Sequence, residues 1–202
     1  MAVFILSLVA SLALTQHSIA DENVEWSFDA SFQHYFLPGE DDLSIPSVSL
    51  TGQHVMLEAR HNYESRDATS IWLGVPFSFT EPFDIELIPM IGGVFNSIHG
   101  MAPGLVFDAS WERWNAYSEL EYVFDFDTRD NNFFYSWSEV TFSVLERIRV
   151  GIVGSRTRAY DSSVELDRGP IIAFDYERVT LTCTALNVDD SAIVILGVDV
   201  SL

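Results

Sequence analysis

Apolar and polar residues alternate with a period of two along much of this chain. In the segment 24–32, five apolar side chains alternate with four polar ones, and the same alternation returns in 55–63 and 114–126. Such a pattern gives an extended strand one apolar face and one polar face. No stretch of similar length carries the apolar stripe of an amphipathic helix. The sequence therefore predicts an all-β chain.

Clusters of turn-forming residues separate these runs at short and fairly regular intervals, as in an antiparallel meander. The runs predict strands near 24–37, 43–51, 54–64, 69–79, 83–95, 101–110, 113–126, 131–142, 146–158, 163–175, 178–186 and 191–202. An even strand number suits a single-chain bacterial barrel, because both termini then lie on the periplasmic side. We expect a closed antiparallel up-and-down transmembrane β-barrel of about 12 strands, with about 10 strands as the alternative.

The connections between the predicted strands differ in length on the two sides of the barrel. If the first strand rises from the periplasm, the periplasmic turns fall near 51–54, 80–83, 110–113, 143–146 and 176–178. The external connections then fall near 38–42, 65–68, 96–100, 127–130, 159–162 and 187–190. The external set is somewhat longer and richer in Gly, Asp and Asn, which is the asymmetry expected of an outer-membrane barrel.

The first twenty residues have the features of a secretory signal peptide. An apolar run from Val3 to Leu14 precedes the small residues Ser18 and Ala20, where a signal peptidase would cleave. The run is shorter than the about 20 apolar residues that a membrane-spanning helix needs. We therefore expect residues 1–20 to be removed near Ala20, and residues 21–202 to form one outer-membrane β-barrel domain.

Alternation alone does not distinguish a membrane barrel from a soluble β-sandwich, because both have strands with one apolar face. Here the apolar face carries large side chains such as Phe28, Leu57, Ile71 and Phe124, and aromatic residues gather near strand ends, as interfacial girdles do. The polar face holds carboxylates and arginines. Together with the signal peptide, these features favour the Gram-negative outer membrane over a secreted sandwich or a lipocalin-like barrel.

The charge balance excludes some partners. The chain has 30 acidic and 10 basic residues, for a net charge of −20, whereas a nucleic-acid-binding surface must bring cations to phosphate groups. We expect no nucleic acid partner and no attachment through a basic surface. Acidic disordered chains are poor in apolar residues, but 48% of this chain is hydrophobic. With Cys183 as the only cysteine, no intrachain disulfide forms, so a closed hydrogen-bonded ladder must hold the fold.

Seven short segments, spread in order over nearly the whole predicted mature chain, form a distinctive set. They are LEARHNYE at 57–64, IPMIGGV at 88–94, APG at 102–104, EY at 121–122, FFYSWSE at 133–139, RTRAY at 156–160 and RG at 168–169. This set resembles a family of bacterial outer-membrane β-barrel proteins of uncharacterised function. The resemblance implies the barrel fold and the outer-membrane location, and it implies no substrate and no catalytic residue.

The predicted polar face points into the barrel and would line its lumen. Its charged residues are Glu58, Arg60, Glu86, Glu119, Glu121, Glu139, Arg147, Arg149, Glu165 and Asp167. A barrel of about 12 strands is wide enough to enclose water or a small ligand. The favoured function is a small channel or solute-binding pore whose acidic lumen prefers cations or polar uncharged solutes. The alternative is a structural barrel plugged by internal ion pairs, because buried charges need partners in any protein.

Two smaller groups could also bind solutes. Tyr135 and Trp137 share the predicted inner face with Glu139, where they either stack on a sugar or aromatic solute or simply pack the lumen. A basic group lies toward the predicted external rim: Arg156, Arg158 and Arg168. It either holds an anionic solute or a lipopolysaccharide phosphate, or it pairs with the nearby Asp161, Glu165 and Asp167. In another strand, we expect Pro89, Gly92 and Gly93 to cause a bend or a bulge.

The sequence gives little support for catalysis or for a metal site. It contains no Gly-x-Ser-x-Gly motif, and His54 and His61 would face opposite sides of their strand, which separates them as metal ligands. An outer-membrane hydrolase, with an Asp beside His34 or His99 near the outer rim, is a third alternative. We expect no cofactor. The expected partners are outer-membrane lipid and small polar or cationic solutes, and the oligomeric state is open.

Overall fold

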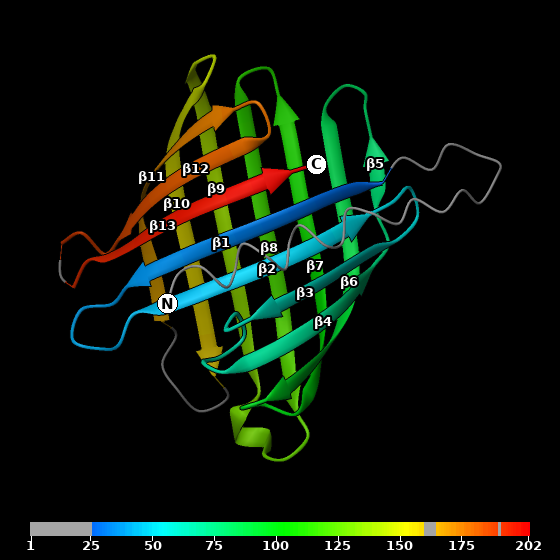
Figure 1. The fold of residues 1–202 in the computed structure, drawn as a ribbon, viewed down its shortest axis with the longest axis vertical. Helices are drawn as coiled ribbons and strands as arrows, with labels where there is room; N and C mark the ends of the chain where they lie inside the picture. The colour runs from blue at the N-terminus through cyan, green and yellow to red at the C-terminus, as the bar shows by residue number, and fades with distance from the viewer. Residues whose placement is uncertain (1–25, 160–164, 190) are drawn as a thin grey trace, which may run out of the picture.

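The computed structural model of the chain describes residues 26–159, 165–189 and 191–202, and it is almost entirely β-structure (Figure 1). The strands are β1 (Ser27–Phe36), β2 (Leu43–Thr51), β3 (Met56–His61), β4 (Ala68–Gly74), β5 (Phe77–Phe79), β6 (Asp84–Asn96), β7 (Gly100–Trp111), β8 (Trp114–Asp125), β9 (Phe133–Leu145), β10 (Ile148–Ala159), β11 (Glu165–Tyr176), β12 (Val179–Leu186) and β13 (Ile193–Ser201). A short 3₁₀ helix, η1 (Arg129–Asn131), precedes β9. No helix in the described ranges is long and apolar enough to cross a membrane. The predicted signal peptide, residues 1–20, lies outside the described residues.

Twelve of these strands close into an antiparallel barrel. Each pairs with its neighbour in the sequence, β1 also pairs with β13, and β4 pairs with β6. Closure matters in a membrane because an unpaired backbone N–H or C=O group is costly in lipid. The prediction of an all-β, up-and-down barrel of 12 strands is therefore confirmed.

The predicted strand 69–79 is divided in the structure. Its first part is β4, which lies in the barrel wall, and its last part is the short β5, which pairs with β6 beyond the end of β4. Between them, the Val75 N–H donates to Pro89 O at 3.1 Å, and Pro76 has no N–H with which to continue the ladder. β5 is therefore an addition to the wall at one end, outside the twelve-stranded closure.

Strand β6 does not have the predicted bulge. It pairs in continuous register with β4 and with β7 through Gly92 and Gly93, so the expectation of a bulge is wrong, whereas the alternative of a bend at these residues stays a prediction. Pro89 is accommodated because β4 ends opposite Met90, and no ladder partner there requires its missing N–H. A register shift occurs instead between Ile148 and Arg149, at the start of β10.

The two ends of the barrel have different connections. At one end, called the turn end here, the hairpins β7–β8, β9–β10 and β11–β12 are each closed by the dipeptide Glu-Arg, at 112–113, 146–147 and 177–178. Glu112 and Glu177 have φ of 54° and 53°, the left-handed conformation that tight two-residue hairpins require. At the other end, called the loop end, the connections are longer, as at 37–42, 62–67 and 126–132. The predicted asymmetry is present.

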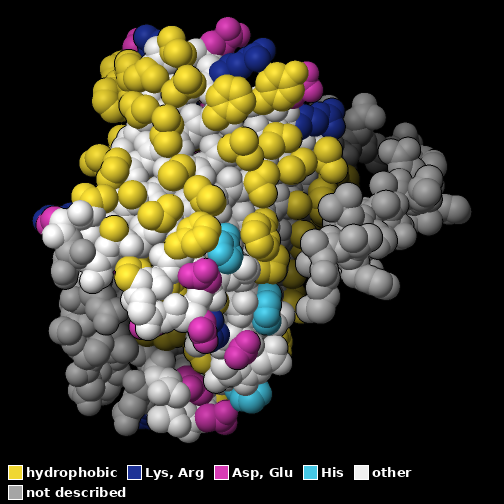
Figure 2. Space-filling view, turned by 60° about the vertical axis from the view of Figure 1, so that its left-hand side comes forward, with side chains coloured by type: hydrophobic (Ala, Val, Ile, Leu, Met, Phe, Trp, Pro, Cys, Tyr) yellow, Lys and Arg dark blue, Asp and Glu magenta, His cyan; other side chains and the backbone are white. Residues whose placement is uncertain are grey.

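The outer surface of the barrel is apolar over most of the strand length. Outward-facing side chains retain much of their exposed surface, including Ile71 at 58%, Phe79 at 53% and Ile152 at 68%. Figure 2 shows hydrophobic side chains over the upper and middle parts of one face, with carboxylates and histidines gathered below them, toward the loop end. An apolar surface of this extent suits lipid and not water.

One side of the barrel interior is filled by apolar side chains, and we call this filled side the dry half. Its inward residues come from β3, β4, β6, β7, β8 and the connection after β6, and they pack around the fully buried Trp72. They are Met56, Ala68, Trp72, Ile88, Met90, Val94, Ile98, Ala102 and Val123. Gly92 leaves room for this ring, because a Cβ there would lie 2.6 Å from the Trp72 side chain. The cavities of the interior lie beside this apolar layer, and a smaller apolar cluster of Val153, Ile171, Leu186 and Ile195 packs on the other side.

Candidate functional site: an acidic lumen

Three cavities follow one another along the open side of the interior. The central cavity has a volume of about 320 Å³, the loop-end cavity about 150 Å³ and the turn-end cavity about 350 Å³. The central cavity shares Tyr35, Tyr135 and Trp137 with the loop-end cavity. It shares Tyr117 and Glu139 with the turn-end cavity. The lumen is thus a series of compartments separated by aromatic side chains.

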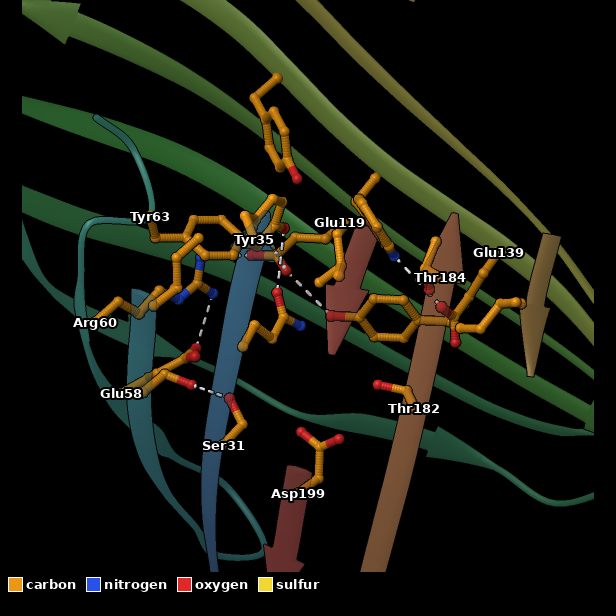
Figure 3. Close-up of a pocket in the computed structure, with 18 residues that line it drawn as sticks. Ser31, Tyr35, Glu58, Arg60, Tyr63, Glu119, Glu139, Thr182, Thr184 and Asp199 are labelled. Carbon is orange, nitrogen blue, oxygen red and sulfur yellow. Dashed lines mark hydrogen bonds and ion pairs between the residues drawn. The ribbon is translucent and has the colours of Figure 1, made fainter. Parts of the chain in front are cut away.

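Arg60 of β3 lies in the wall of the central cavity, where the cavity borders the dry half. Its Nη2 is 2.8 Å from Glu58 Oε2, and its Nη1 is 2.6 Å from Glu119 Oε1 and 2.5 Å from Glu121 Oε1. Figure 3 shows Arg60 and Glu58 together at one side of the cavity. Arg60, Glu119 and Glu121 are all buried, and buried charges are stable only when they have such partners. We call these four residues the Arg60 cluster.

Two tyrosines add hydrogen bonds to the Arg60 cluster. The hydroxyl groups of Tyr63 and Tyr117 both donate to Glu119 Oε2, at 2.9 Å and 3.1 Å. The Arg60 guanidinium also lies over the Tyr63 ring, 4.4 Å from its centroid, a favourable cation–π contact. The Tyr63 ring meets that of Tyr135 edge-on, with centroids 5.6 Å apart. Tyr63 and Tyr135 therefore extend the cluster into an aromatic wall.

Tyr63 reaches the lumen because the β3–β4 connection, 62–67, turns inward. Asn62 and Asp67 at its two ends both have φ of 63°, and the Asp67 N–H donates to Asn62 Oδ1 at 2.7 Å. Between them, the buried Glu64 accepts a hydrogen bond from Trp72 Nε1 at 3.2 Å. The connection is therefore fastened to the dry half on one side and narrows the lumen on the other.

Arg149 of β10 is the second inward-facing arginine, and it lies toward the turn end. Its Nε and Nη2 donate to Asp175 Oδ2 and Oδ1 at 2.8 Å and 2.9 Å, the bidentate geometry that suits a guanidinium and a carboxylate. Thr180 Oγ1 donates to Asp175 Oδ1 at 2.8 Å. The positive charge of Arg149 is therefore already matched by one carboxylate.

Two further carboxylates, Glu139 of β9 and Asp199 of β13, line the central cavity. In Figure 3, Glu139 lies across the cavity from Arg60, and Asp199 points into it from below. Glu139 accepts only a long hydrogen bond, 3.4 Å, from Trp137 Nε1. In the part of the chain that the structure describes, neither carboxylate forms an ion pair. This side of the lumen therefore carries negative charge without a matching cation, which favours positive solutes.

Most of the predicted lumen residues lie on the inner face in the observed register. Those that line one of the three cavities are Glu58, Arg60, Glu119, Glu139, Arg149, Asp167, Tyr135 and Trp137. Glu121 lies in the buried Arg60 cluster, and Glu86 shares the inward face of β6 with Ile88 and Met90. Glu165 is placed only by its backbone, opposite Thr157, because its side chain lies outside the described part of the structure.

The expectation that Arg147 points into the lumen is wrong. Arg147 is exposed in the turn between β9 and β10, and its guanidinium lies over the ring of Tyr176, 5.0 Å from the centroid. Arg113, in the neighbouring Glu-Arg turn, lies over Phe142 at 5.2 Å in the same manner. The strand alternation that places a residue inside does not continue through a turn. Both arginines cover outward-facing rings at the turn end, and Arg113 also borders the turn-end cavity.

The predicted basic rim lies near the loop end. Arg156 and Arg168 are exposed and alternate with the inward-facing Ser155 and Asp167 in the β10–β11 pairing, so they are on the outer face. Asp167 accepts a hydrogen bond from Asn187 Nδ2 at 2.5 Å and lies on the opposite face from both arginines. The Arg158 side chain and Asp161 lie outside the described residues. Binding of an anion at this rim stays a prediction.

Both histidines considered for a hydrolase do have an aspartate nearby. His34 Nε2 lies 3.7 Å from Asp42 Oδ2, and its Nδ1 is 2.9 Å from Ser44 Oγ. His99 Nδ1 lies 3.0 Å from Asp127 Oδ2. Asp42 also accepts the Leu37 N–H at 3.2 Å, so these contacts brace connections at the loop end. Among the described residues, no group of three or more His, Cys, Asp or Glu side chains is placed to hold a metal ion.

Sequence reasoning missed several residues of the lumen. Tyr35, Tyr117 and Asp199 line the central cavity, and each could have been found by extending the period-two alternation of its strand. Tyr63 could not have been found in this way, because it lies in a connection whose inward turn depends on backbone conformation. The signal for Trp72 was present in the run Ile71-Trp72-Leu73, which is apolar on both faces and therefore indicates packing inside as well as outside.

Comparison with known proteins shows similarity of fold. No family model matches the sequence, and no curated protein matches it. Among solved structures, the KdgM porin in complex with disordered oligogalacturonate has a TM-score of 0.61 at 12% identity, over 86% of this chain and 99% of that one. The NanC porin has a TM-score of 0.56 at 10% identity, over 87% and 100%. The Acinetobacter baumannii outer membrane protein Omp33 has 0.53 at 10% identity, over 90% and 100%.

These identities are too low to transfer a function, but the coverage is nearly complete for both partners in each comparison. All three are outer-membrane barrels, and two are porins. Together with the twelve-stranded closure and the apolar exterior, the comparisons confirm the predicted outer-membrane β-barrel fold and its location.

Proposed function

We propose that residues 21–202 form a narrow outer-membrane pore that admits small cationic or polar uncharged solutes. The turn end lies in the periplasm, the loop end faces outward, and the apolar exterior contacts outer-membrane lipid. The passage follows the loop-end, central and turn-end cavities along the open side of the barrel. The dry half is filled by apolar side chains, so it supports the wall and offers no route for solutes.

One observation carries the charge preference: both inward-facing arginines of the described strands are already held by carboxylates, whereas Glu139 and Asp199 face the central cavity without an ion-pair partner. Arg60 contacts three carboxylates and Arg149 contacts one. In a lumen with low-dielectric walls, the field of an unmatched carboxylate acts over several ångströms and raises the local concentration of cations. An anion entering the same space meets repulsion from both acids.

The comparison with the KdgM porin sharpens this proposal by contrast. That porin is in complex with disordered oligogalacturonate, an oligosaccharide with a carboxylate on each sugar. A polyanion needs basic side chains along its path. The described lumen of this chain offers Glu139 and Asp199 there, so we propose a solute class of opposite sign within a similar fold.

The plugged structural barrel is the competing proposal, and the Arg60 cluster is the observation that favours it. Four charged side chains and two tyrosines interlock there, and the rings of Tyr35, Tyr63 and Tyr135 separate two of the cavities. These rings narrow the passage between the central and loop-end cavities. A measurement of ion conductance distinguishes an open pore from a plugged barrel.

The test is single-channel conductance of the refolded mature chain in a planar bilayer, with a salt gradient to give the reversal potential. We expect discrete cation-selective steps. Glu139→Gln and Asp199→Asn should each lower the cation preference, and Glu146→Gln, in an exposed turn between β9 and β10, serves as the matched control that leaves it nearly unchanged. A folded, heat-modifiable barrel that carries no current would overturn the pore and favour the plugged barrel.

A further inference from the structure

The central cavity combines three kinds of wall. Aromatic rings of Tyr35, Tyr117, Tyr135 and Trp137 face it from several strands, carboxylates of Glu139 and Asp199 enter it from β9 and β13, and the hydroxyl groups of Thr182 and Thr184 lie between these acids (Figure 3). Its volume is about 320 Å³. One water molecule occupies about 30 Å³ in the liquid. The cavity is therefore large enough for a small organic molecule.

The charge of this cavity is not balanced from within the described chain. Arg60 is already in contact with three carboxylates, and Arg149 is held in a bidentate pair. Glu119, only 4% exposed, lines the cavity, and its Oε1 receives no well-aligned hydrogen bond although Arg60 Nη1 lies 2.6 Å away. A buried carboxylate oxygen with spare acceptor capacity is costly unless something donates to it. The wall therefore favours a ligand that brings positive charge and N–H donors.

The lining also indicates which kind of cation fits. No group of three or more His, Cys, Asp or Glu in the described ranges is placed to hold a metal ion, and Mg²⁺ and Ca²⁺ need six or more oxygen ligands at short range. Aromatic faces, in contrast, attract organic ammonium groups through their ring electrons and cover the attached carbon atoms. Four such rings beside two acids match an amine with a short carbon chain.

We propose that the central cavity is a binding subsite for small organic amines, with ammonium groups at Glu139 and Asp199 and the carbon chain against Trp137 and Tyr135. This subsite rests on the proposed pore function, which it refines by naming the solute class. An amine held here would stand midway along the lumen, between the loop-end and turn-end cavities. Amine binding can be measured without measuring transport, so the proposed subsite and the proposed pore can be tested and overturned separately.

The experiment is isothermal titration calorimetry on the refolded mature chain in detergent micelles, with three probes of equal length. These are 1,4-diaminobutane, which is dicationic, 1,4-butanediol, which is neutral, and succinate, which is dianionic. We expect the diamine to bind at least about tenfold more tightly than the diol, and succinate to show no binding. The Glu139→Gln/Asp199→Asn double variant should weaken diamine binding by about tenfold or more.

A second set of variants keeps the proposal testable if the double variant refolds poorly. Trp137→Leu should weaken diamine binding by roughly threefold to thirtyfold, because it removes the aromatic ring that covers the carbon chain beside the ammonium group at Glu139, while Trp137→Phe should retain most of the affinity. Glu146→Gln and the outward-facing Phe36→Leu should leave the affinity unchanged. Equal affinity for diamine and diol, or diamine binding unaffected by every lumen variant, would overturn the subsite. Cation-selective conductance without diamine binding would overturn the subsite alone and leave the pore standing.

Discussion

Arg60 and Glu121 are 61 positions apart in the sequence, yet Arg60 Nη1 lies 2.5 Å from Glu121 Oε1 in the barrel interior. The contact joins β3 to β8, which are separated in the wall by β4, β6 and β7. Their backbones exchange no ladder hydrogen bonds, so this side-chain contact links them directly through the barrel interior. The Arg60 cluster therefore contributes to holding the barrel in shape as well as to the charge of the lumen.

Removing the contacts of Arg60 should lower the free energy of unfolding strongly. Arg60→Met leaves three carboxylates close together without their cation, and breaking a buried charge pair in this way costs about 3–5 kcal/mol. We expect that loss in the free energy of unfolding, measured by urea titration of the refolded barrel. The matched change Arg149→Met affects a pair that is 26% and 35% exposed and should cost about 1 kcal/mol. Equal losses for the two variants would show that the Arg60 cluster is no stronger than a surface pair.

The packing around Trp72 predicts a difference between two glycines. A Cβ at Gly92 would lie 2.6 Å from the Trp72 ring, whereas a Cβ at Gly154 would meet nothing within 4 Å. Gly92→Ala should therefore destabilise the barrel by about 1–3 kcal/mol through overpacking, and Gly154→Ala should be neutral or stabilising by up to about 1 kcal/mol. Urea titration and heat modifiability on gels report both. If Gly92→Ala left the free energy of unfolding unchanged, the side chains around Trp72 would have to repack without cost.

The aromatic partition between two cavities predicts an effect on conductance. Tyr35 lines both the central and the loop-end cavities, and its hydroxyl donates only a 3.2 Å hydrogen bond, to Gln33 Oε1. Tyr35→Ala should widen the passage and raise single-channel conductance roughly twofold. Phe36→Ala, one residue further and on the outer face, is the control and should leave conductance unchanged. An unaltered current in Tyr35→Ala would place the narrowest point elsewhere.

The single cysteine tests the strand register directly. Cys183 is exposed and pairs with the outward-facing Ile172 and Leu196, so it should face lipid. In reconstituted vesicles it should react with a lipid-soluble maleimide and resist a charged, water-soluble methanethiosulfonate. Thr182→Cys, made together with Cys183→Ser, moves the thiol to the lumen, where the charged reagent should react. A shift of one residue would exchange the two results, because neighbouring strand residues face opposite sides.

The barrel itself was predictable from the sequence because its strands obey a simple rule. Side chains alternate between lipid and lumen, so strands 24–37 and 113–126 could be recognised without knowledge of their partners. The rule failed where the chain leaves extended structure. Pro76 interrupts the predicted strand 69–79, and Arg147 was assigned to the lumen by counting through a two-residue turn.

The candidate site was predictable only in part, for a different physical reason. Alternation identified the inward face, which is how Glu58, Arg60, Glu119, Glu121 and Glu139 were found. It carries no information about which inward side chains meet across the lumen, because contacts such as that of Arg60 with Glu121 depend on barrel closure. The dry half was missed because the lumen was treated as uniformly polar, although Trp72 and Met90 point into it.

The uneven filling of the interior also determines which part of the wall can give way. Strands β3, β4 and β6–β8 are backed by the apolar layer around Trp72, so they act as a fixed support. The strands on the opposite side, from β9 through β13 to β1 and β2, border the cavities and carry a smaller apolar cluster of Val153, Ile171, Leu186 and Ile195. We therefore expect any widening of the passage for a solute to occur mainly on this less densely filled side of the barrel.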